Sequence, residues 1–145
     1  PFIWAEPSGG RQRTNCLGST MDIGATVLDR LGLAPARGML GRSLLPAMAG
    51  EDVRENILVE YDALSPVPGT KVPTRIRSLV SDGWRLTVYD GIEWGEMYNL
   101  KDDPLEVRNL WGSQAHGHIR AELTEKLLRE MIANGETSPV PKYIA

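Results

Sequence analysis

The most constraining feature of this 145-residue chain is a strand-like segment that runs into a proline turn, at residues 95–110. Met97 and Tyr98 suit a half-buried strand, and the polar residues that follow are turn formers. Pro104 has no N–H to donate and moves the preceding residue out of the helical region, so no helix passes through this point. Leu110 then returns one apolar side chain to the body of the protein. The segment therefore predicts a strand, a sharp turn and an anchor.

The composition is that of an ordinary globular chain with a core of its own, since 41% of the residues are hydrophobic and 24% are charged. A net charge of −3 gives no basic surface for nucleic acid and no polybasic patch for a membrane. No apolar run approaches the ~20 residues that a membrane helix requires. The single cysteine, Cys16, excludes an internal disulfide but leaves the compartment open between cytoplasm and periplasm.

The first 50 residues predict one buried strand and one helix. Residues 2–5 form a continuous apolar run, which is typical of a strand buried on both faces of a parallel sheet, although the chain offers no neighbours for it. The helix is expected at residues 23–31, where apolar residues recur at helical spacing. Asp22 is the expected N-cap, and Gly32 stands where a left-handed C-cap belongs.

The remainder predicts an antiparallel sheet covered by a helix. Strands are expected at residues 57–61, 75–80, 84–89 and 94–100, with Asp82-Gly83 as a hairpin turn and a proline-rich loop at residues 65–70. A helix at residues 119–132 would cover one face of the sheet. Its expected inward stripe is Ile119, Leu123, Leu127, Leu128 and Met131. The expected fold class is α+β, a four-stranded antiparallel sheet packed on a C-terminal helix.

Residues 95–110 also closely resemble a signature near the C-terminus of sulfatases. In that family a strand reading roughly Glu-Leu-Tyr-Asp-Leu runs into a turn reading x-x-Asp-Pro-x-Glu-x-x-Asn-Leu. The strand half is matched by Glu96, Met97, Tyr98, Asn99 and Leu100, with Met97 for Leu and Asn99 for Asp. The turn half is matched by Asp103, Pro104, Glu106, Asn109 and Leu110 at the same spacing.

The first 50 residues resemble the same family. Its last large-sheet strand is followed by a segment like Ser-x-x-Asp-Leu-x-Pro-Thr-Leu-Leu-Asp-Leu-x-Gly and then by a Gly-x-Ser-Leu-x-Pro loop. The matching residues are Ser19, Asp22, Ile23, Thr26, Val27, Leu28, Asp29, Leu31 and Gly32, and then residues 41–46. The resemblance covers the C-terminal third or so of the family's length. It implies that residues 1–50 are the tail of a large α/β catalytic domain and that residues 51–145 are a small α+β subdomain.

The residues that carry sulfatase chemistry are not among those that the resemblance covers. The family uses formylglycine, made from Cys or Ser within Cys-x-Pro/Ala-Ser-Arg, and a calcium ion held by Asp and Asn side chains. Cys16 is followed by Leu17-Gly18-Ser19-Thr20, which lacks both the Pro/Ala and the Arg. We therefore expect no catalytic or metal-binding residue and no cofactor in this chain. Formylglycine and calcium are expected in the full-length parent protein.

Other chemistry-bearing residues have simpler interpretations. His116 and His118 stand at i, i+2 without a nearby third ligand and favour a solvated loop over a metal pair. Asp102-Asp103 favours turn chemistry over paired catalytic carboxylates. Three residues remain as candidates for binding an anionic substrate at the rim of the cleft: Arg75, Arg77 and Glu60.

The sequence thus predicts the C-terminal part of a sulfatase-like sulfuric ester hydrolase that is inactive alone. Two alternatives stay open: part of a phosphonate or phosphate ester hydrolase of the same superfamily, and a non-catalytic association module. The expected partner is the remainder of the parent catalytic domain, with a homo-oligomer as the other option. Neither nucleic acid nor a membrane is an expected partner.

Overall fold

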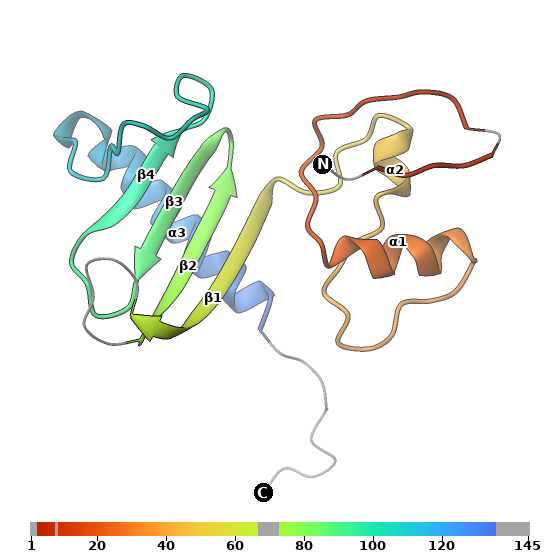
Figure 1. Cartoon of the computed structure of the whole chain (residues 1–145), viewed down its shortest axis with the longest axis horizontal. Helices are drawn as coiled ribbons and strands as arrows, with labels where there is room; N and C mark the ends of the chain where they lie inside the picture. The colour runs from red at the N-terminus through yellow and green to blue at the C-terminus, as the bar shows by residue number, and fades with distance from the viewer. Residues whose placement is uncertain (1–2, 8, 67–72, 136–145) are drawn as a thin grey trace, which may run out of the picture.

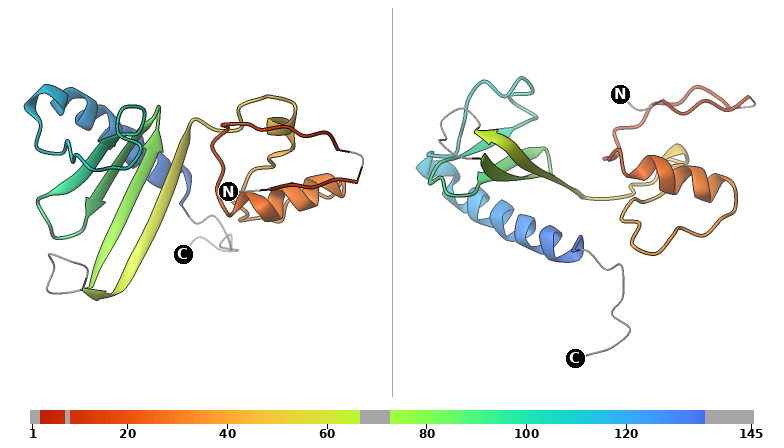
Figure 2. Two further views of the ribbon diagram at one scale, coloured as in Figure 1. Left: turned by 45° about the horizontal axis from the view of Figure 1, so that its top comes forward. Right: turned by 60° about the horizontal axis from the view of Figure 1, so that its bottom comes forward.

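The structure, a computed structural model, describes residues 3–7, 9–66 and 73–135 (Figure 1). Two parts of the chain lie next to each other. The first contains α1 (Asp22–Arg30) and the short α2 (Leu45–Met48), and the second contains the β-sheet and α3 (Gly117–Ala133). Figure 2 shows the extended chain that leads from the first part into the sheet. No helix among the described residues has the length and apolar character needed to cross a membrane.

The sheet is an antiparallel meander in the order β1-β2-β3-β4. Its strands are β1 (Asn56–Pro66), β2 (Pro73–Ser81), β3 (Trp84–Tyr89) and β4 (Gly95–Asn99). The register sets four apolar side chains directly opposite one another across the sheet: Leu58, Leu79, Leu86 and Met97. Leu79, Leu86 and Met97 are fully buried. The predicted α+β fold with a four-stranded antiparallel sheet is confirmed.

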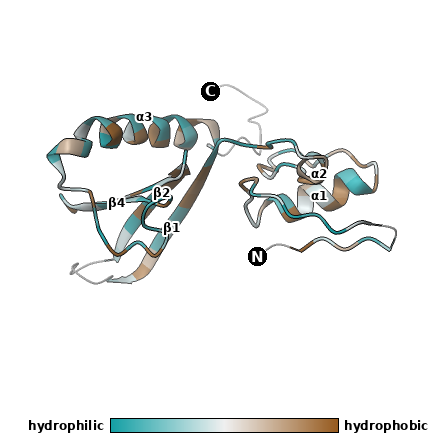
Figure 3. Cartoon of the chain, turned by 90° about the horizontal axis from the view of Figure 1, so that it is seen from above, coloured by the Kyte–Doolittle hydropathy of each residue, from teal (hydrophilic) through white to brown (hydrophobic). Residues whose placement is uncertain are grey.

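Helix α3 covers the face of the sheet that carries this apolar row (Figure 3). Leu123 and Leu127 point into the core, which Leu110 completes from the loop after β4. The expected inward stripe is wrong at its C-terminal end, because the side chain of Leu128 is 56% exposed and that of Met131 is 38% exposed. Lys126 and Glu130 are half-buried beside Leu123 and Leu127, so the inward face of α3 runs through these positions and not through Leu128 or Met131.

The hairpin between β2 and β3 has the predicted turn. Asp82 has φ of 52° and Gly83 has φ of 79°, the two positive values that define a type I′ turn. Aspartate tolerates the left-handed region better than most residues and glycine adopts it freely. The prediction from the Asp82-Gly83 pair is confirmed.

The segment after β4 closes the outer edge of that strand. Asn109 Oδ1 accepts the Met97 N–H at 3.1 Å, and Asn109 Nδ2 donates to the Gly95 carbonyl at 2.9 Å. The Leu110 N–H donates to the Met97 carbonyl at 2.8 Å, so its side chain enters the core as predicted. One asparagine and one backbone amide thus take the place of a fifth strand.

The turn that delivers Asn109 is held by two carboxylates. Asp103 accepts the N–H groups of Val107 at 3.1 Å and Arg108 at 2.8 Å. Glu106, at φ of 56°, receives two hydrogen bonds of 2.7 Å from Arg85 of β3. Both carboxylates position backbone, so the interpretation of Asp102-Asp103 as turn chemistry is confirmed for Asp103.

Helix α1 ends as predicted. Gly32 has φ of 69°, and its N–H donates to the Asp29 carbonyl at 2.9 Å. The Leu33 N–H donates to the Leu28 carbonyl at 2.9 Å. These two bonds define a Schellman motif.

The beginning of α1 differs from the prediction. Met21 occupies the N-cap position without a side-chain cap, and Asp22 is the first helical residue. The predicted N-cap role of Asp22 is wrong, because its carboxylate is used in contacts with distant parts of the chain.

Two further predictions are wrong. Residues 3–5 form no strand, and Ile3 is 82% exposed, because no described segment pairs with them through strand hydrogen bonds. Ser65 and Pro66 belong to β1 rather than to a loop. Phe2 and the rest of the predicted loop, residues 67–70, lie outside the described residues.

Candidate functional site

The three residues predicted to bind an anionic substrate lie together on β1 and β2. Register pairs Glu60 with Arg77 and Asp62 with Arg75. Arg77 Nε lies 2.9 Å from Glu60 Oε1, and its Nη1 lies 2.7 Å from Asp62 Oδ1. The structure thus brings the three predicted residues together and adds Asp62 to them. Asp62 could have been predicted from the sequence, because a residue two positions after Glu60 in a strand lies on the same face of the sheet.

Most of the charge in this cluster is already paired. The hydrogen bond from Arg77 holds the pKa of the Asp62 carboxyl below its usual range, and the same bond raises the pKa of Arg77. Arg75 is different: its side chain is 71% exposed, and its Nε lies 3.7 Å from Asp62 Oδ2. Arg75 is therefore the cation of this cluster with donors to spare for an incoming anion.

A second polar assembly joins the two parts of the chain. Asp22 is fully buried, and its Oδ1 accepts the Arg42 N–H at 2.8 Å and also binds the guanidinium of Arg54. Its Oδ2 accepts the Ser19 N–H at 2.7 Å. One carboxylate therefore fixes the start of α1, the loop before α2 and the entry to β1.

Local sequence explains how these segments meet. Ser19 Oγ accepts the Met21 N–H at 3.4 Å and Asp22 accepts the Ser19 N–H at 2.7 Å, so side-chain hydrogen bonds to the backbone form a local turn just before α1. A Cβ at Gly41 would fall 2.1 Å from the Met21 carbonyl oxygen, so only glycine lets Arg42 come this close. The Ser-x-x-Asp spacing could have revealed the first contact, whereas nothing near Arg54 in the sequence reveals the second.

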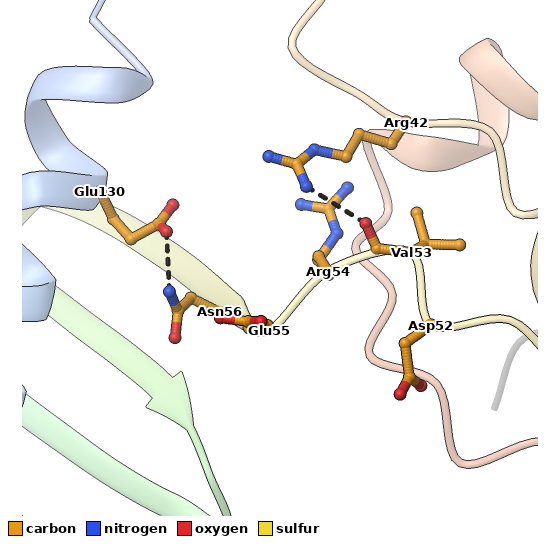
Figure 4. Close-up of a pocket in the computed structure, with 7 residues that line it drawn as sticks. All are labelled: Arg42, Asp52, Val53, Arg54, Glu55, Asn56 and Glu130. Atoms are coloured by element: carbon orange, nitrogen blue, oxygen red, sulfur yellow. Dashed lines mark hydrogen bonds between the residues drawn. The ribbon is translucent and has the colours of Figure 1, made fainter.

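The junction contains a cavity of about 380 Å³ beside this assembly (Figure 4). Its walls come from the loop before α2, the entry to β1 and the C-terminal part of α3. The lining residues are Arg42, Asp52, Val53, Arg54, Glu55, Asn56 and Glu130. Sequence reasoning identified none of them as site residues.

Cys16 lies at the same junction in a structural role. Its half-buried thiol accepts the Val53 N–H at 3.4 Å and contacts the Leu17 carbonyl at 3.5 Å. His116 is hydrogen-bonded through Nδ1 to Ser113 Oγ at 2.8 Å, and its ring lies 5.9 Å from that of Trp84. Within residues 3–7, 9–66 and 73–135, no three His, Cys, Asp or Glu side chains gather in a way that could hold a metal ion. These residues therefore do not fit the calcium site that the family resemblance implies for the parent.

The solved structures that resemble this chain include a sulfatase and a phosphonate monoester hydrolase. BT1596, a 2-O GAG sulfatase, shares 26% identity at a TM-score of 0.66, over 78% of this chain and 24% of its own. BT4656, solved with its substrate D-glucosamine-2-N,6-O-disulfate, shares 24% identity at a TM-score of 0.65, over 84% and 25%. The phosphonate monoester hydrolase of Agrobacterium radiobacter shares 21% identity at a TM-score of 0.65, over 81% and 25%.

The four-stranded meander and its covering helix thus match the C-terminal region of sulfatases in fold. Residues 2–133 match the family described as N-sulphoglucosamine sulphohydrolase, C-terminal, and the chain belongs to that family. No curated protein matches the chain. The chain spans about a quarter of the length of the solved structures that it resembles.

Proposed function

We propose that this chain is the C-terminal part of a sulfuric ester hydrolase and has no activity alone. The observation that carries the proposal is the family match over residues 2–133, together with a sequence that lacks a formylglycine motif. In the parent protein the remainder of the catalytic domain would supply the nucleophile and the calcium ligands. Formylglycine and calcium are thus proposed for that remainder, and no catalytic step is assigned to the residues described above.

We assign Arg75, Arg77 and Glu60 to the rim of the substrate cleft in the parent. The free donors of Arg75 suit a sulfate or carboxylate group of the substrate, since guanidinium binds such oxyanions in a bidentate manner. Arg77 holds Glu60 and Asp62 in place and acts as a positioning residue. Sulfated saccharides are the substrate class to test first, given the names of the family and of BT1596.

The first experiment measures hydrolysis of 4-nitrophenyl sulfate by the purified 145-residue chain with calcium added. No turnover above background is expected, because a calcium ion without its ligand set and a nucleophile cannot catalyse the reaction. Turnover that persists in the Cys16→Ala variant would mean that an unrecognised active site exists and that the proposal is wrong.

The second experiment uses the full-length parent with a panel of sulfated saccharides. Arg75→Gln should raise KM about tenfold and leave kcat nearly unchanged, which is the pattern of a lost binding contact. Arg108→Gln is the matched control, because Arg108 is exposed and forms no ion pair within the described residues. An equal KM in both variants would mean that Arg75 does not bind the substrate and that its assignment to the cleft is wrong.

The likeness to the phosphonate monoester hydrolase supports a second candidate function. Sulfate and phosphonate monoesters are similar in charge and shape, and the described residues contain no group that separates them. The full-length parent should therefore be assayed with 4-nitrophenyl sulfate and 4-nitrophenyl phenylphosphonate side by side. A kcat/KM that is higher for the phosphonate would replace the sulfatase proposal with this one.

A further inference from the structure

The junction cavity presents two guanidinium groups but only one carboxylate to pair with them. Arg54 binds Asp22, and its side chain is 9% exposed. Among the described residues no other carboxylate forms an ion pair with the guanidinium of Arg54. The guanidinium of Arg42 has no ion-pair partner among the described residues.

The buried arginine also has an unused donor. Arg54 Nε is closed to solvent and has no hydrogen-bond partner among the described atoms. It is the one buried side-chain nitrogen or oxygen in the described part of the chain that lacks a partner. A buried unpaired donor is destabilising, and it is most so when it belongs to a charged group. An acceptor bound to this N–H would remove that energetic cost.

Arg42 brings further donors to the same end of the cavity. Its Nη1 donates to the Val53 carbonyl at 3.1 Å, next in the chain to Arg54, and the side chain is otherwise exposed. Figure 4 shows both guanidinium groups on the Val53 side, with Glu130 and Asn56 across the cavity. Glu130 accepts from Asn56 Nδ2 at 2.9 Å and Asn134 Nδ2 at 3.1 Å, and it forms no ion pair with Arg54 or Arg42 among the described residues.

We propose that the junction cavity binds one small oxyanion, a sulfate, phosphate or carboxylate group, between Arg42 and the Nε of Arg54. Guanidinium N–H groups match the spacing of oxyanion oxygens, and their hydrogen bonds to charged acceptors are among the strong ones. Because the Arg54 Nε is closed to solvent, binding there requires a neighbouring side chain to move, and we assign that movement to the exposed Arg42. Asp52, Glu55 and Glu130 make the rest of the wall acidic, so the cavity accepts a single compact anion rather than a polyanionic chain.

The site is independent of the proposed function, since its lining includes none of Arg75, Arg77 and Glu60. An anion seated there would link α1, the loop before α2 and the entry to β1 through the two arginines. Bound anion is therefore expected to stabilise the junction, because it binds the folded state alone.

The test is an NMR titration of the 145-residue chain with sulfate, phosphate or acetate against chloride at matched ionic strength. The Nε–Hε resonance of Arg54, assigned by its loss in Arg54→Lys, should shift with a saturable dependence on at least one of the three anions. Arg42→Gln should weaken that binding about tenfold or more, since it removes charge-assisted hydrogen bonds. Which anion saturates first tells whether inorganic anions or a carboxylate group is the ligand.

Arg37→Gln is the matched control, because Arg37 is exposed in a nearby loop and forms no ion pair within the described residues. Its affinity should equal that of the parent chain. Equal weakening in Arg37→Gln and Arg42→Gln would show a general charge effect and overturn the site. Shifts that rise linearly for all three anions without saturation would overturn it too. Should Arg54→Lys fail to fold, the comparison of Arg42→Gln with Arg37→Gln decides the question.

Discussion

At the scale of single residues, the side chain of Asp22 joins three segments of the chain. It is fully buried, and its two oxygens bind three segments that lie far apart in sequence. Thr26 extends this assembly, because its hydroxyl donates to the Asp22 carbonyl at 2.6 Å and accepts the Leu44 N–H at 2.9 Å. The loop before α2 is thus tied to α1 through hydrogen bonds as well as apolar contact.

We predict that Asp22→Ala lowers the free energy of unfolding by about 3–5 kcal/mol, because it leaves the buried Arg54 without its partner. Loss of a simple N-cap would cost about 1 kcal/mol. Urea denaturation followed by tryptophan fluorescence separates the two values. The double variant Asp22→Ala/Arg54→Met should recover part of the loss, and failure to recover any of it would assign the cost to the backbone contacts alone.

Substitution of Gly32 measures the energetic cost of its left-handed backbone conformation. A Cβ at Gly32 would contact nothing within 4 Å, so the cost of Gly32→Ala comes from its φ of 69° alone. We predict a loss of about 1–2 kcal/mol in the free energy of unfolding. Gly112→Ala is the control, because that position also has open space but no positive φ. Equal melting temperatures for the two variants would contradict the left-handed C-cap.

At the scale of elements, the two edge strands of the sheet, β1 and β4, differ in how their outer sides are covered. The outer edge of β4 is closed by Asn109 and Leu110. On the other edge, β1 presents exposed apolar side chains at Val59, Tyr61 and Leu64. An open edge of this kind is a place for another segment to pair.

We predict that Asn109→Ala costs about 2–3 kcal/mol, since it removes hydrogen bonds to Met97, Gly95 and the Trp111 N–H, each worth about 1 kcal/mol. Hydrogen exchange of the β4 amides should accelerate at the same time. Asn99→Ala is the comparison, because its bonds to Asp102 and Lys101 are exposed. A smaller effect for Asn109→Ala than for Asn99→Ala would mean that the edge closure is not needed.

At the scale of the whole molecule, the apolar face of α1 has no cover among the described residues. Ile23 is 44% exposed, Val27 42% and Leu31 66%. These residues repeat at helical spacing and form one patch, which is typical of an interface. In the proposed parent the remainder of the catalytic domain would be the partner for this patch.

Without that partner we predict that the chain self-associates. Sedimentation velocity across a concentration series should show a rising average mass, and Leu31→Lys should weaken association about tenfold, because it removes one large apolar side chain from the contact. Leu105→Lys is the control, since Leu105 is 83% exposed in the turn after β4. A monomeric mass for the unaltered chain at high micromolar concentration would contradict the prediction.

Elements whose hydrogen bonds close within a few residues could be predicted from the sequence. Gly32, the Asp82-Gly83 turn and the stop at Pro104 follow from the conformations open to those residues. The spacing around Pro104 indicated the family. These features depend on neighbours in the chain, so the sequence alone determined them.

Contacts between distant residues were decided by the tertiary structure. Aspartate is a common N-cap residue, but Oδ1 of Asp22 instead accepts hydrogen bonds from the backbone of Arg42 and the guanidinium of Arg54. Arg77 was predicted to bind an anionic substrate, and folding brings Glu60 and Asp62 within hydrogen-bond distance of it. The helical spacing also left both Leu127 and Leu128 as inward residues, and packing on the sheet buries only Leu127. In each case the partner lies many residues away, and only the packed chain determines which side chain meets it.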